Sequence, residues 1–324
     1  SESAYFLSVN RNKRSIELNI KDPNDLLVLY SLIEEADVFI TNIPRMSSLA
    51  RAKIDPETLK KLPGKFAIGH NRGGYDIIAQ GEAGLMTLTG ETDGGPIRFP
   101  TPMADITAGI YTTIGILTAL YARDNNENGS NTGQFLDVSL VDAQTTWLAN
   151  LGGSFFATGE RPERLGNIHP TVTPYQPMQA RDKMIIVGVG TERLWEKLCI
   201  ALGLDKNIQQ DPRFSSNAAR NMHRSELIEL LEAKLVTKDA EDWVEVFVEH
   251  SIPAGPINYP EDTLTDKHII SRDMIVELEH PLLGIVKSIG NPIHLSKNGP
   301  TYRRYPPRLG EHNEEIRLEI KNKA

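Results

Sequence analysis

The chain has 324 residues, of which 24% are charged and 40% are hydrophobic, so it is long enough for about two domains with a sizeable core. Its 35 Lys and Arg residues and 43 Asp and Glu residues give a formal net charge of −8. That balance argues against a broad nucleic-acid surface, which needs clustered positive charge. The single cysteine, Cys199, excludes an intrachain disulfide, a cysteine zinc site and a CxxC redox pair, so a reducing compartment is expected.

No segment has the pattern of a signal peptide or a membrane span. Residues 1–5 lack the basic and apolar regions of a signal peptide. The most apolar run, 106–122, is shorter than the roughly 20 residues that cross a bilayer, and it contains several threonines and two glycines. We expect this run to be a buried core helix. We also expect the protein to be cytoplasmic or, as the alternative, to reside in the mitochondrial matrix.

The first part of the chain alternates strand-like and helix-like segments. Asp22 and Pro23 begin a predicted helix that ends near Ala36, with Asp as its N-cap and Pro at the first helical position. A second helix is predicted over 56–62. Short apolar runs predict strands at 15–18, 38–40 and 66–68. Strands that alternate with helices predict a parallel sheet, and Asn42 lies at the carboxyl end of one of them, where such sheets bind ligands.

The remaining elements follow the same reasoning. The apolar run 106–122 predicts a helix about 25 Å long. The composition changes after Gly166. Beyond the apolar run, the patterns predict a strand at 135–141, a helix at 142–157, a strand at 184–189, helices at 191–202, 218–235 and 239–250, a hairpin at 274–288 and a charged C-terminal helix. The predicted fold class is α/β, with a larger first domain and a smaller α+β second domain.

Several common chemistries leave no motif in this sequence. The eight histidines are scattered, and no HxH or HExxH spacing occurs, so no metal site is predicted. Neither GxGxxG nor a P-loop is present, and there is no GxSxG nucleophile elbow.

Asp105 directly precedes the apolar run and invites two interpretations. It could be the N-cap of the helix, because Asp is among the best capping residues. It could also be a nucleophile toward an acyl group. The glycine-rich approach at 93–96 lets other backbone come close to the carboxylate, and a helix N-terminus favours negative charge. The pattern alone leaves both interpretations open.

An ordered series of motifs covers nearly the whole chain. In the first half these are NRNKRSIEL at 10–18, ADV at 36–38, GYD at 74–76 with Gln80, TG at 89–90, MAD at 103–105, GQ at 133–134 and DVSL at 137–140. In the second half they are GN at 166–167, HP at 169–170, PYQ at 174–176, DPRF at 211–214 with Asn217, PAGP at 253–256 and LGEH at 309–312. This series resembles the family III CoA-transferases, the CaiB/BaiF type that includes carnitine and formyl-CoA transferases.

The resemblance implies both an architecture and an activity. It implies a large Rossmann-like domain formed by 1–160 and 291–324, a small α+β domain at 167–290, and an interlocked homodimer. The implied activity moves CoA from an acyl-CoA, succinyl-CoA for example, to a free carboxylic acid. Asp105 would form a mixed anhydride and then an aspartyl-CoA thioester. CoA and acyl-CoA would be substrates, with no metal and no tightly bound cofactor.

The resemblance also implies residues near the reacting groups. Tyr75 and Asp76 match a tyrosine–acid pair beside the nucleophile, where Tyr75 could donate a hydrogen bond near the reacting carbonyl. Asp76 could equally be a structural hydrogen-bond acceptor. Gly166 and Asn167 match the glycine loop that covers the substrate in the family.

Five positions match CoA contacts of the family. Leu18 and Lys21 match contacts to the adenosine-phosphate part of CoA, and a lysine suits phosphate as a point charge. Lys21 could otherwise be a solvated lysine at a turn. Asn42 and Ile43 match contacts at a strand end, although Asn42 could simply form a turn. Arg51 matches a phosphate-binding arginine.

Two features depart from the family pattern, and two alternative functions stay open. The family has a further N-terminal segment of βαβ size that this sequence does not show, and its loop before GYD is longer than the one between Ile68 and Arg72. One alternative is an α-methylacyl-CoA racemase of the same fold, which has Gly-His-Asp where this chain has GYD at 74–76. Tyrosine is a poor substitute for a base that works near neutral pH. The other alternative is a non-catalytic CoA-binding protein.

Overall fold

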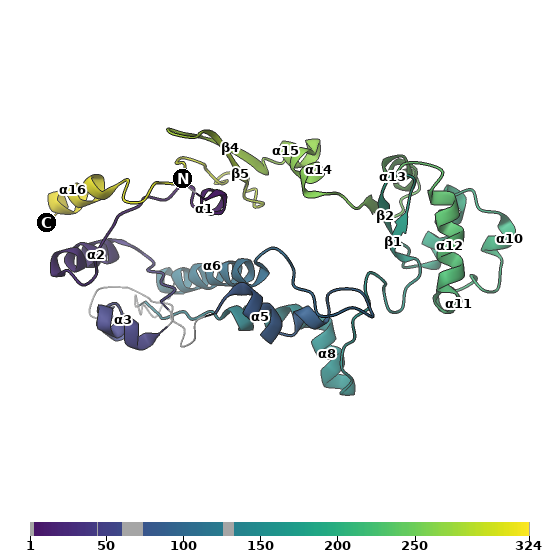
Figure 1. The fold of residues 1–324 in the computed structure, drawn as a ribbon, viewed down its shortest axis with the longest axis horizontal. Helices are drawn as coiled ribbons and strands as arrows, with labels where there is room; N and C mark the ends of the chain where they lie inside the picture. The colour runs from purple at the N-terminus through teal and green to yellow at the C-terminus, as the bar shows by residue number, and fades with distance from the viewer. Residues whose placement is uncertain (1–2, 44, 60–73, 126–132, 324) are drawn as a thin grey trace. The chain divides into compact units, whose positions relative to one another are not determined.

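The structure, a computed structural model, places the chain in two compact units (Figure 1). The residues it describes are 3–43, 45–59, 74–125 and 133–323. Unit 1 comprises 1–85, 98–156 and 264–324, and unit 2 comprises 86–97 and 157–263. The predicted small domain includes residues 264–290, whereas the structure groups them with unit 1. The reason is local packing: the Arg11 guanidinium donates to the carbonyl oxygen of Ile289 at 2.7 Å.

Unit 1 is mainly helical. Its helices are α1 (Ala4–Val9), α2 (Pro23–Glu35), α3 (Met46–Ala52), α4 (Pro56–Leu59), α5 (Asp76–Glu82), α6 (Met103–Asp124), α7 (Leu140–Thr145), α15 (Lys267–Ser271) and α16 (Asn313–Lys323). An antiparallel hairpin is formed by β4 (Ile275–His280) and β5 (Gly284–Ile289). Along the sequence, α8 (Ala149–Thr158) and α14 (Pro260–Thr265) each span a boundary between the two units.

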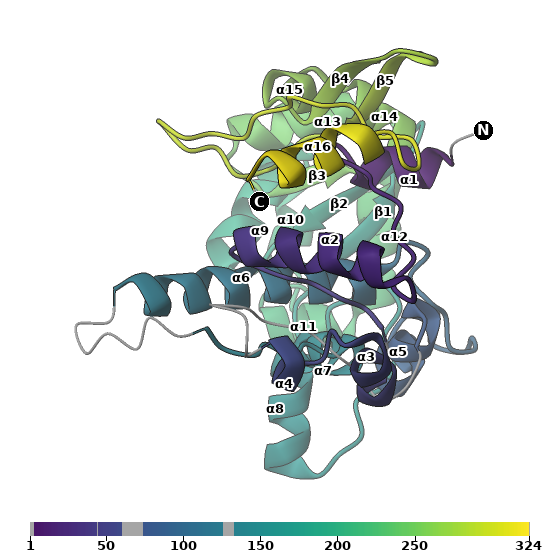
Figure 2. The ribbon, with the colours of Figure 1, turned by 90° about the vertical axis from the view of Figure 1, so that its left-hand side faces the viewer.

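The first long helix forms as its sequence predicts. Asp22 is the N-cap of α2, and its carboxylate accepts from the Asn24 amide at 2.8 Å. The C-terminal helix α16 lies along α2 (Figure 2), where Arg317 pairs with Asp25 at 2.7 Å and Lys323 with Glu35 at 2.8 Å. Residues near the two ends of the chain thus pack together in unit 1.

The strand predicted at 15–18 is wrong, because its backbone groups find other partners. The Ser15 amide donates to His312 Nδ1 at 3.1 Å, and the Glu17 amide donates to Asn313 Oδ1 at 2.7 Å. These bonds tie the segment to the start of α16 rather than to a neighbouring strand.

The other strands predicted for the first domain do not build a sheet in the described residues. The runs at 38–40 and 135–141 form no strand there, and 66–68 lies outside the described residues. Val38, Phe39 and Leu136 instead line a small cavity against α6. A Cβ at Gly115 of α6 would come within 2.8 Å of the end of the Leu136 side chain, so a larger residue there would force Leu136 to move. The described strands all pair antiparallel, and the predicted parallel sheet is not observed among them.

Helix α6 is not the buried core helix that its composition predicts. Only small side chains on it are buried, namely Ala104, Thr107 and Ala108. Most of its large apolar side chains are exposed, among them Ile110, Ile114, Leu117 and Tyr121, whereas Ile116 and Leu120 are half-buried. By length and composition alone, α6 is the one helix among the described residues that could cross a membrane. Helices α5 and α7 both pack against α6, and the small side chains on α6 allow this close approach.

Unit 2 is an α+β unit around a three-stranded antiparallel sheet in the order β1-β2-β3. The strands are β1 (Tyr175–Gln179), β2 (Met184–Gly188) and β3 (Ala254–Pro256). The helices are α9 (Glu192–Ala201), α10 (Lys206–Gln209), α11 (Asn217–Met222), α12 (Arg224–Leu235) and α13 (Ala240–Glu249). The single helix predicted at 218–235 is two helices, because the chain breaks at His223.

The core of unit 2 combines one face of the sheet with the apolar sides of its helices. Leu198, Leu231 and Phe247 come from three helices and are fully buried, together with Ile185 of β2. The helix predicted at 191–202 matches α9, whose N-cap Thr191 accepts from the Leu194 amide.

Candidate active site

The candidate nucleophile lies in the first turn of α6. The helix begins at Met103, with Pro102 as its N-cap, so Asp105 is the third helical residue. The N-cap interpretation of Asp105 is therefore wrong. An aspartate at this place still lies at the positive end of the helix dipole, which favours negative charge. The residue as a whole is exposed, although its carboxylate is partly shielded from water, and the carboxylate accepts no hydrogen bond from the described residues.

The first turn of α6 is capped from a different helix. Asp76, the first residue of α5, accepts the Ala104 amide on Oδ1 at 2.7 Å. Its second oxygen, Oδ2, accepts from Gln80 Nε2 at 2.6 Å. Both carboxylate oxygens of Asp76 are thus engaged, and Asp105 is left free of the capping task. Tyr75 precedes Asp76 as the N-cap residue of α5, and its side chain is largely exposed.

Two carboxylates close together affect each other's protonation. Partial burial and the negative charge of Asp76 raise the pKa of Asp105 above its ordinary value. A carboxylate with a raised pKa is more basic, which favours attack on an electrophilic carbonyl carbon.

Two of the predicted CoA contacts meet in one pocket. Lys21 and Arg51 both line a hollow of about 520 Å³, which is completed by Ile20, Pro23, Leu26, Ser48, Ala52 and Lys53. Lys21 directly precedes the N-cap of α2, whereas Arg51 lies in the last turn of α3. Three cationic side chains around one open pocket suit a ligand with phosphate groups. Leu18, Asn42 and Ile43 do not line it.

Lys53 is the cation of this pocket that the sequence analysis missed. It follows α3 in the left-handed conformation, with φ of 57°. The Tyr30 hydroxyl donates to its carbonyl oxygen at 2.8 Å and so fixes the turn. Its only signal in the sequence was its place two residues after Arg51.

The predicted substrate loop lies in unit 2. Gly166 has a φ of +60°, a conformation that favours glycine. Before the loop, Arg164 donates to the carbonyl oxygens of Gly94 and Gly95. Asn167 follows in the turn that leads to residues 169–173.

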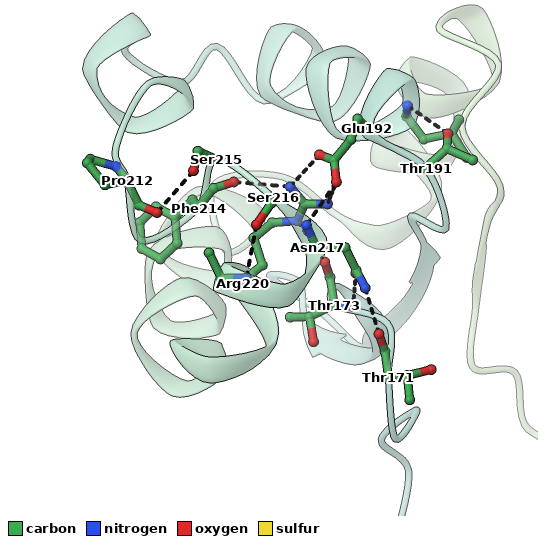
Figure 3. Close-up of polar contacts among 12 residues, drawn as sticks. Thr171, Thr173, Thr191, Glu192, Pro212, Phe214, Ser215, Ser216, Asn217 and Arg220 are labelled. Atoms are coloured by element: carbon green, nitrogen blue, oxygen red, sulfur yellow. Dashed lines mark hydrogen bonds and ion pairs between the residues drawn. The ribbon is translucent and has the colours of Figure 1, made fainter.

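Side chains of α11 hold the segment that follows this loop (Figure 3). Asn217 donates to the Thr171 carbonyl at 2.6 Å and accepts the Thr173 amide at 3.1 Å. Arg220, which is fully buried, donates to the Thr173 carbonyl at 3.0 Å and pairs with Glu192 at 2.8 Å. The motif containing Asn217 therefore has a structural role that the sequence analysis did not assign.

The described residues contain no group of three or more His, Cys, Asp and Glu side chains arranged to hold a metal ion. What they do bring together is Asp105 with Asp76, on two packed helices, and Lys21 with Arg51 in one pocket. Tyr75 is adjacent to Asp76 along the chain. The first group offers a free carboxylate at a helix N-terminus, and the second offers cations for an anionic ligand.

Comparison with known proteins identifies relatives along the whole chain. The chain is 33% identical over 329 residues to the succinate–glutarate CoA-transferase of Agrobacterium fabrum, covering 98% of this chain and 81% of the relative. It is 31% identical over 332 residues to the acetyl-CoA:oxalate CoA-transferase of Acetobacter aceti, covering 98% and 82%.

A solved structure agrees with these relatives. The crystal structure of a CaiB/BaiF family protein from Brucella suis superposes with a TM-score of 0.87 at 32% identity, covering 98% of this chain and 84% of that one. Residues 1–313 match the family model described as CoA-transferase family III. The chain therefore belongs to CoA-transferase family III and is a CoA-transferase with a mixed α/β fold.

Proposed function

We propose that this enzyme moves CoA from an acyl-CoA to a free carboxylic acid through covalent intermediates on Asp105. The observation that supports this proposal is that the two carboxylates at the start of α6 have different environments. Asp76 caps the helix, and the Asp105 carboxylate is exposed in the first helical turn, with a raised pKa. A free and basic carboxylate is suited to attack a carbonyl carbon. The positive end of the α6 dipole favours the negative charge that develops in that step.

The proposed reaction has two symmetrical halves. An Asp105 oxygen attacks the thioester carbonyl, and the CoA thiolate leaves, which gives a mixed anhydride. The thiolate then attacks the Asp105 carbonyl, releases the donor acid and leaves an aspartyl-CoA thioester. The acceptor carboxylate attacks that thioester and expels the thiolate. The thiolate finally attacks the acceptor carbonyl, which gives the new acyl-CoA and restores Asp105 without net proton uptake.

Two neighbouring side chains have proposed roles in this reaction. Tyr75 would donate a hydrogen bond to the oxygen of the reacting carbonyl, which its exposed position permits. Asp76 would act as a fixed negative charge and a helix cap rather than as a proton carrier, because both of its oxygens already accept hydrogen bonds. Gly166 and Asn167 are proposed as the substrate loop.

The CoA moiety would bind through its phosphates to the pocket lined by Lys21 and Arg51, with Lys53 as a third cation. Leu18, Asn42 and Ile43 are proposed as further contacts to CoA. The names of the relatives refer to short dicarboxylic acids, namely succinate, glutarate and oxalate. We therefore propose a small carboxylic acid as the acceptor and succinyl-CoA as the first donor to test.

An interlocked homodimer, with the first unit built on a Rossmann-like plan, is the proposed assembly. The exposed apolar side chains of α6 support it, since Ile110, Leu117 and Tyr121 are more than half exposed in the single chain. A soluble protein that leaves such a row uncovered exposes an apolar patch, which marks an interaction surface.

The first test is direct detection of the covalent intermediate. Incubation with succinyl-CoA followed by hydroxylamine is expected to convert the Asp105 side chain to a hydroxamate, read by peptide mass spectrometry. Asp105→Asn should form no adduct and lose at least about 1,000-fold in turnover, because the nucleophile is gone. Asp142→Asn is the matched control, because Asp142 is also an exposed aspartate in a first helical turn. A hydroxamate on another residue would contradict the assignment.

The raised pKa of Asp105 predicts an effect on stability. Above that pKa the ionised carboxylate opposes folding, and a neutral asparagine does not, so Asp105→Asn should raise the Tm by up to about 2 °C at pH 7. Below about pH 3 the carboxyl is protonated in both the folded and unfolded states, and the difference should disappear. Thermal unfolding at both pH values measures this.

The control for that measurement has the opposite sign. A hydrogen bond from Arg317 lowers the pKa of Asp25, so the ionised Asp25 stabilises the fold. Asp25→Asn should therefore lower the Tm at pH 7, and this effect should fade as the pH falls through the lowered pKa. Equal shifts in the two variants would refute the interpretation of Asp105.

The cationic pocket predicts a change in KM rather than in kcat. Lys21→Ala and Arg51→Ala should each raise the KM for acyl-CoA about 5- to 10-fold with kcat nearly unchanged, because phosphate contacts remote from the reaction bind substrate and transition state alike. Added salt should shrink the difference from the unsubstituted enzyme. Lys287→Ala, which removes an exposed lysine paired with Glu277, is the control. An unchanged KM in both pocket variants would place CoA elsewhere.

The homodimer predicts a solution mass twice that of one chain, measured by light scattering coupled to gel filtration. Leu117→Glu should weaken assembly, because it places a charge on the exposed apolar side of α6. Ile200→Glu, at a similarly exposed apolar position on α9, is the control. A stable monomer for the unsubstituted chain would contradict the proposed assembly.

A further inference from the structure

Gln80 is a buried glutamine on α5, and every polar atom of its side-chain amide is in use. It is 3% exposed. Its Oε1 accepts the Phe99 amide at 2.8 Å, and its Nε2 donates to the Phe99 carbonyl at 3.2 Å and to Asp76 Oδ2 at 2.6 Å. Only this orientation of the amide satisfies its neighbours. Turned by 180°, its N–H groups would face the Phe99 N–H, and its oxygen would face two acceptors.

Gln80 and Asp76 lie one helical turn apart, on the same face of α5. Gln80 holds the backbone of Phe99, and Asp76 holds the Ala104 amide. The segment between these two attachments contains Pro100 and Pro102, whose rings restrict the backbone further. The residue that follows Ala104 is Asp105. The bonds from α5 therefore hold both ends of the short segment that leads to Asp105.

We propose that Gln80 is a positioning residue for Asp105, and this inference rests on the proposed role of Asp105 as the nucleophile. Gln80 acts through Asp76 and Phe99 and does not touch the reacting atoms. Attack by a carboxylate requires close and aligned approach to the thioester carbon, and a misplacement of about 1 Å can cost about 100-fold in rate. The pocket lined by Lys21 and Arg51 is built on other elements, so Gln80 affects kcat and not the KM for acyl-CoA.

A reciprocal substitution of Gln80 and Asp76 distinguishes a role of Gln80 in positioning Asp105 from a role in folding alone. In Gln80→Glu the new side chain cannot donate to Asp76, and it places a second carboxylate against the first. In the double variant Asp76→Asn, Gln80→Glu, the asparagine amide donates to the glutamate, its oxygen still accepts the Ala104 amide, and the Phe99 amide still has an acceptor. The double variant keeps the total charge, but it replaces the 3.2 Å bond to the Phe99 carbonyl with a contact between two oxygens, so a partial recovery is expected.

The experiment compares steady-state kinetics and the single-turnover rate of Asp105 acylation by succinyl-CoA in the full-length chain. Gln80→Glu is expected to lower kcat and the acylation rate at least about tenfold, with the KM for acyl-CoA within about twofold of its original value. The kcat and the acylation rate of the double variant should be at least about threefold higher than those of Gln80→Glu. Gln144→Met is the matched control: Gln144 of α7 is also fully buried, and its amide has no hydrogen-bond partner among the described residues. It should keep its kcat.

The outcomes distinguish the positioning role of Gln80 from the nucleophile role of Asp105. If Gln80→Glu fails to fold, Gln80→Met tests the same split between kcat and KM. An Asp105 adduct that forms at the original rate in a folded Gln80 variant overturns the positioning role and leaves the nucleophile standing. A loss of kcat that the double variant does not recover also overturns it, because such a loss is structural. The absence of any Asp105 adduct in the unsubstituted enzyme overturns both assignments.

Discussion

The bond between the Asp76 carboxylate and the Ala104 amide organises the site. It satisfies one of the free amides at the N-terminus of α6, which would otherwise need a capping side chain from the preceding loop. Pro102, at the N-cap position, offers no such side chain. Because the cap comes from α5, the first turn of α6 can carry a second carboxylate, Asp105, that takes no part in capping. One hydrogen bond thus joins two helices and separates a structural carboxylate from the proposed nucleophile.

The same bond explains the electrostatics of the site. Asp76 stabilises the start of α6 through its negative charge, and that charge also raises the pKa of Asp105. Folding therefore brings together two carboxylates that repel each other, and the capping bond and the bond from Gln80 offset part of that repulsion. In the proposed reaction this destabilised carboxylate is neutralised when it becomes an anhydride or a thioester. Forming either intermediate relieves the repulsion, which favours the covalent states.

Local signals were predictable from the sequence, and tertiary pairings were not. Asp22 capped α2 as expected, because the cap, the following proline and the helix are neighbours along the chain. The cap of α6 lies 28 residues from its amide, and no local pattern points to it. The alternation of apolar and polar residues at 15–18 was typical of a strand. Such a pattern does not indicate which segment the backbone will bond to, and here that segment is the start of α16. The motif resemblance selected Asp105, whereas the meeting of Lys21 with Arg51 and Lys53 required the fold.

Helix α6 shows what an apolar composition can and cannot indicate. Its sequence correctly predicted a long helix but wrongly predicted a buried one, because the structure buries only small residues on it and leaves most of the large ones exposed. Small side chains allow α5 and α7 to approach α6 closely. The large side chains can be buried only against a surface that the single chain does not supply. In the proposed homodimer, that surface would come from the partner. Helix α6 would then be held by α5 at its N-terminal end and by the partner along its length. Both contacts would fix the position of Asp105, the proposed nucleophile, in the first turn of α6.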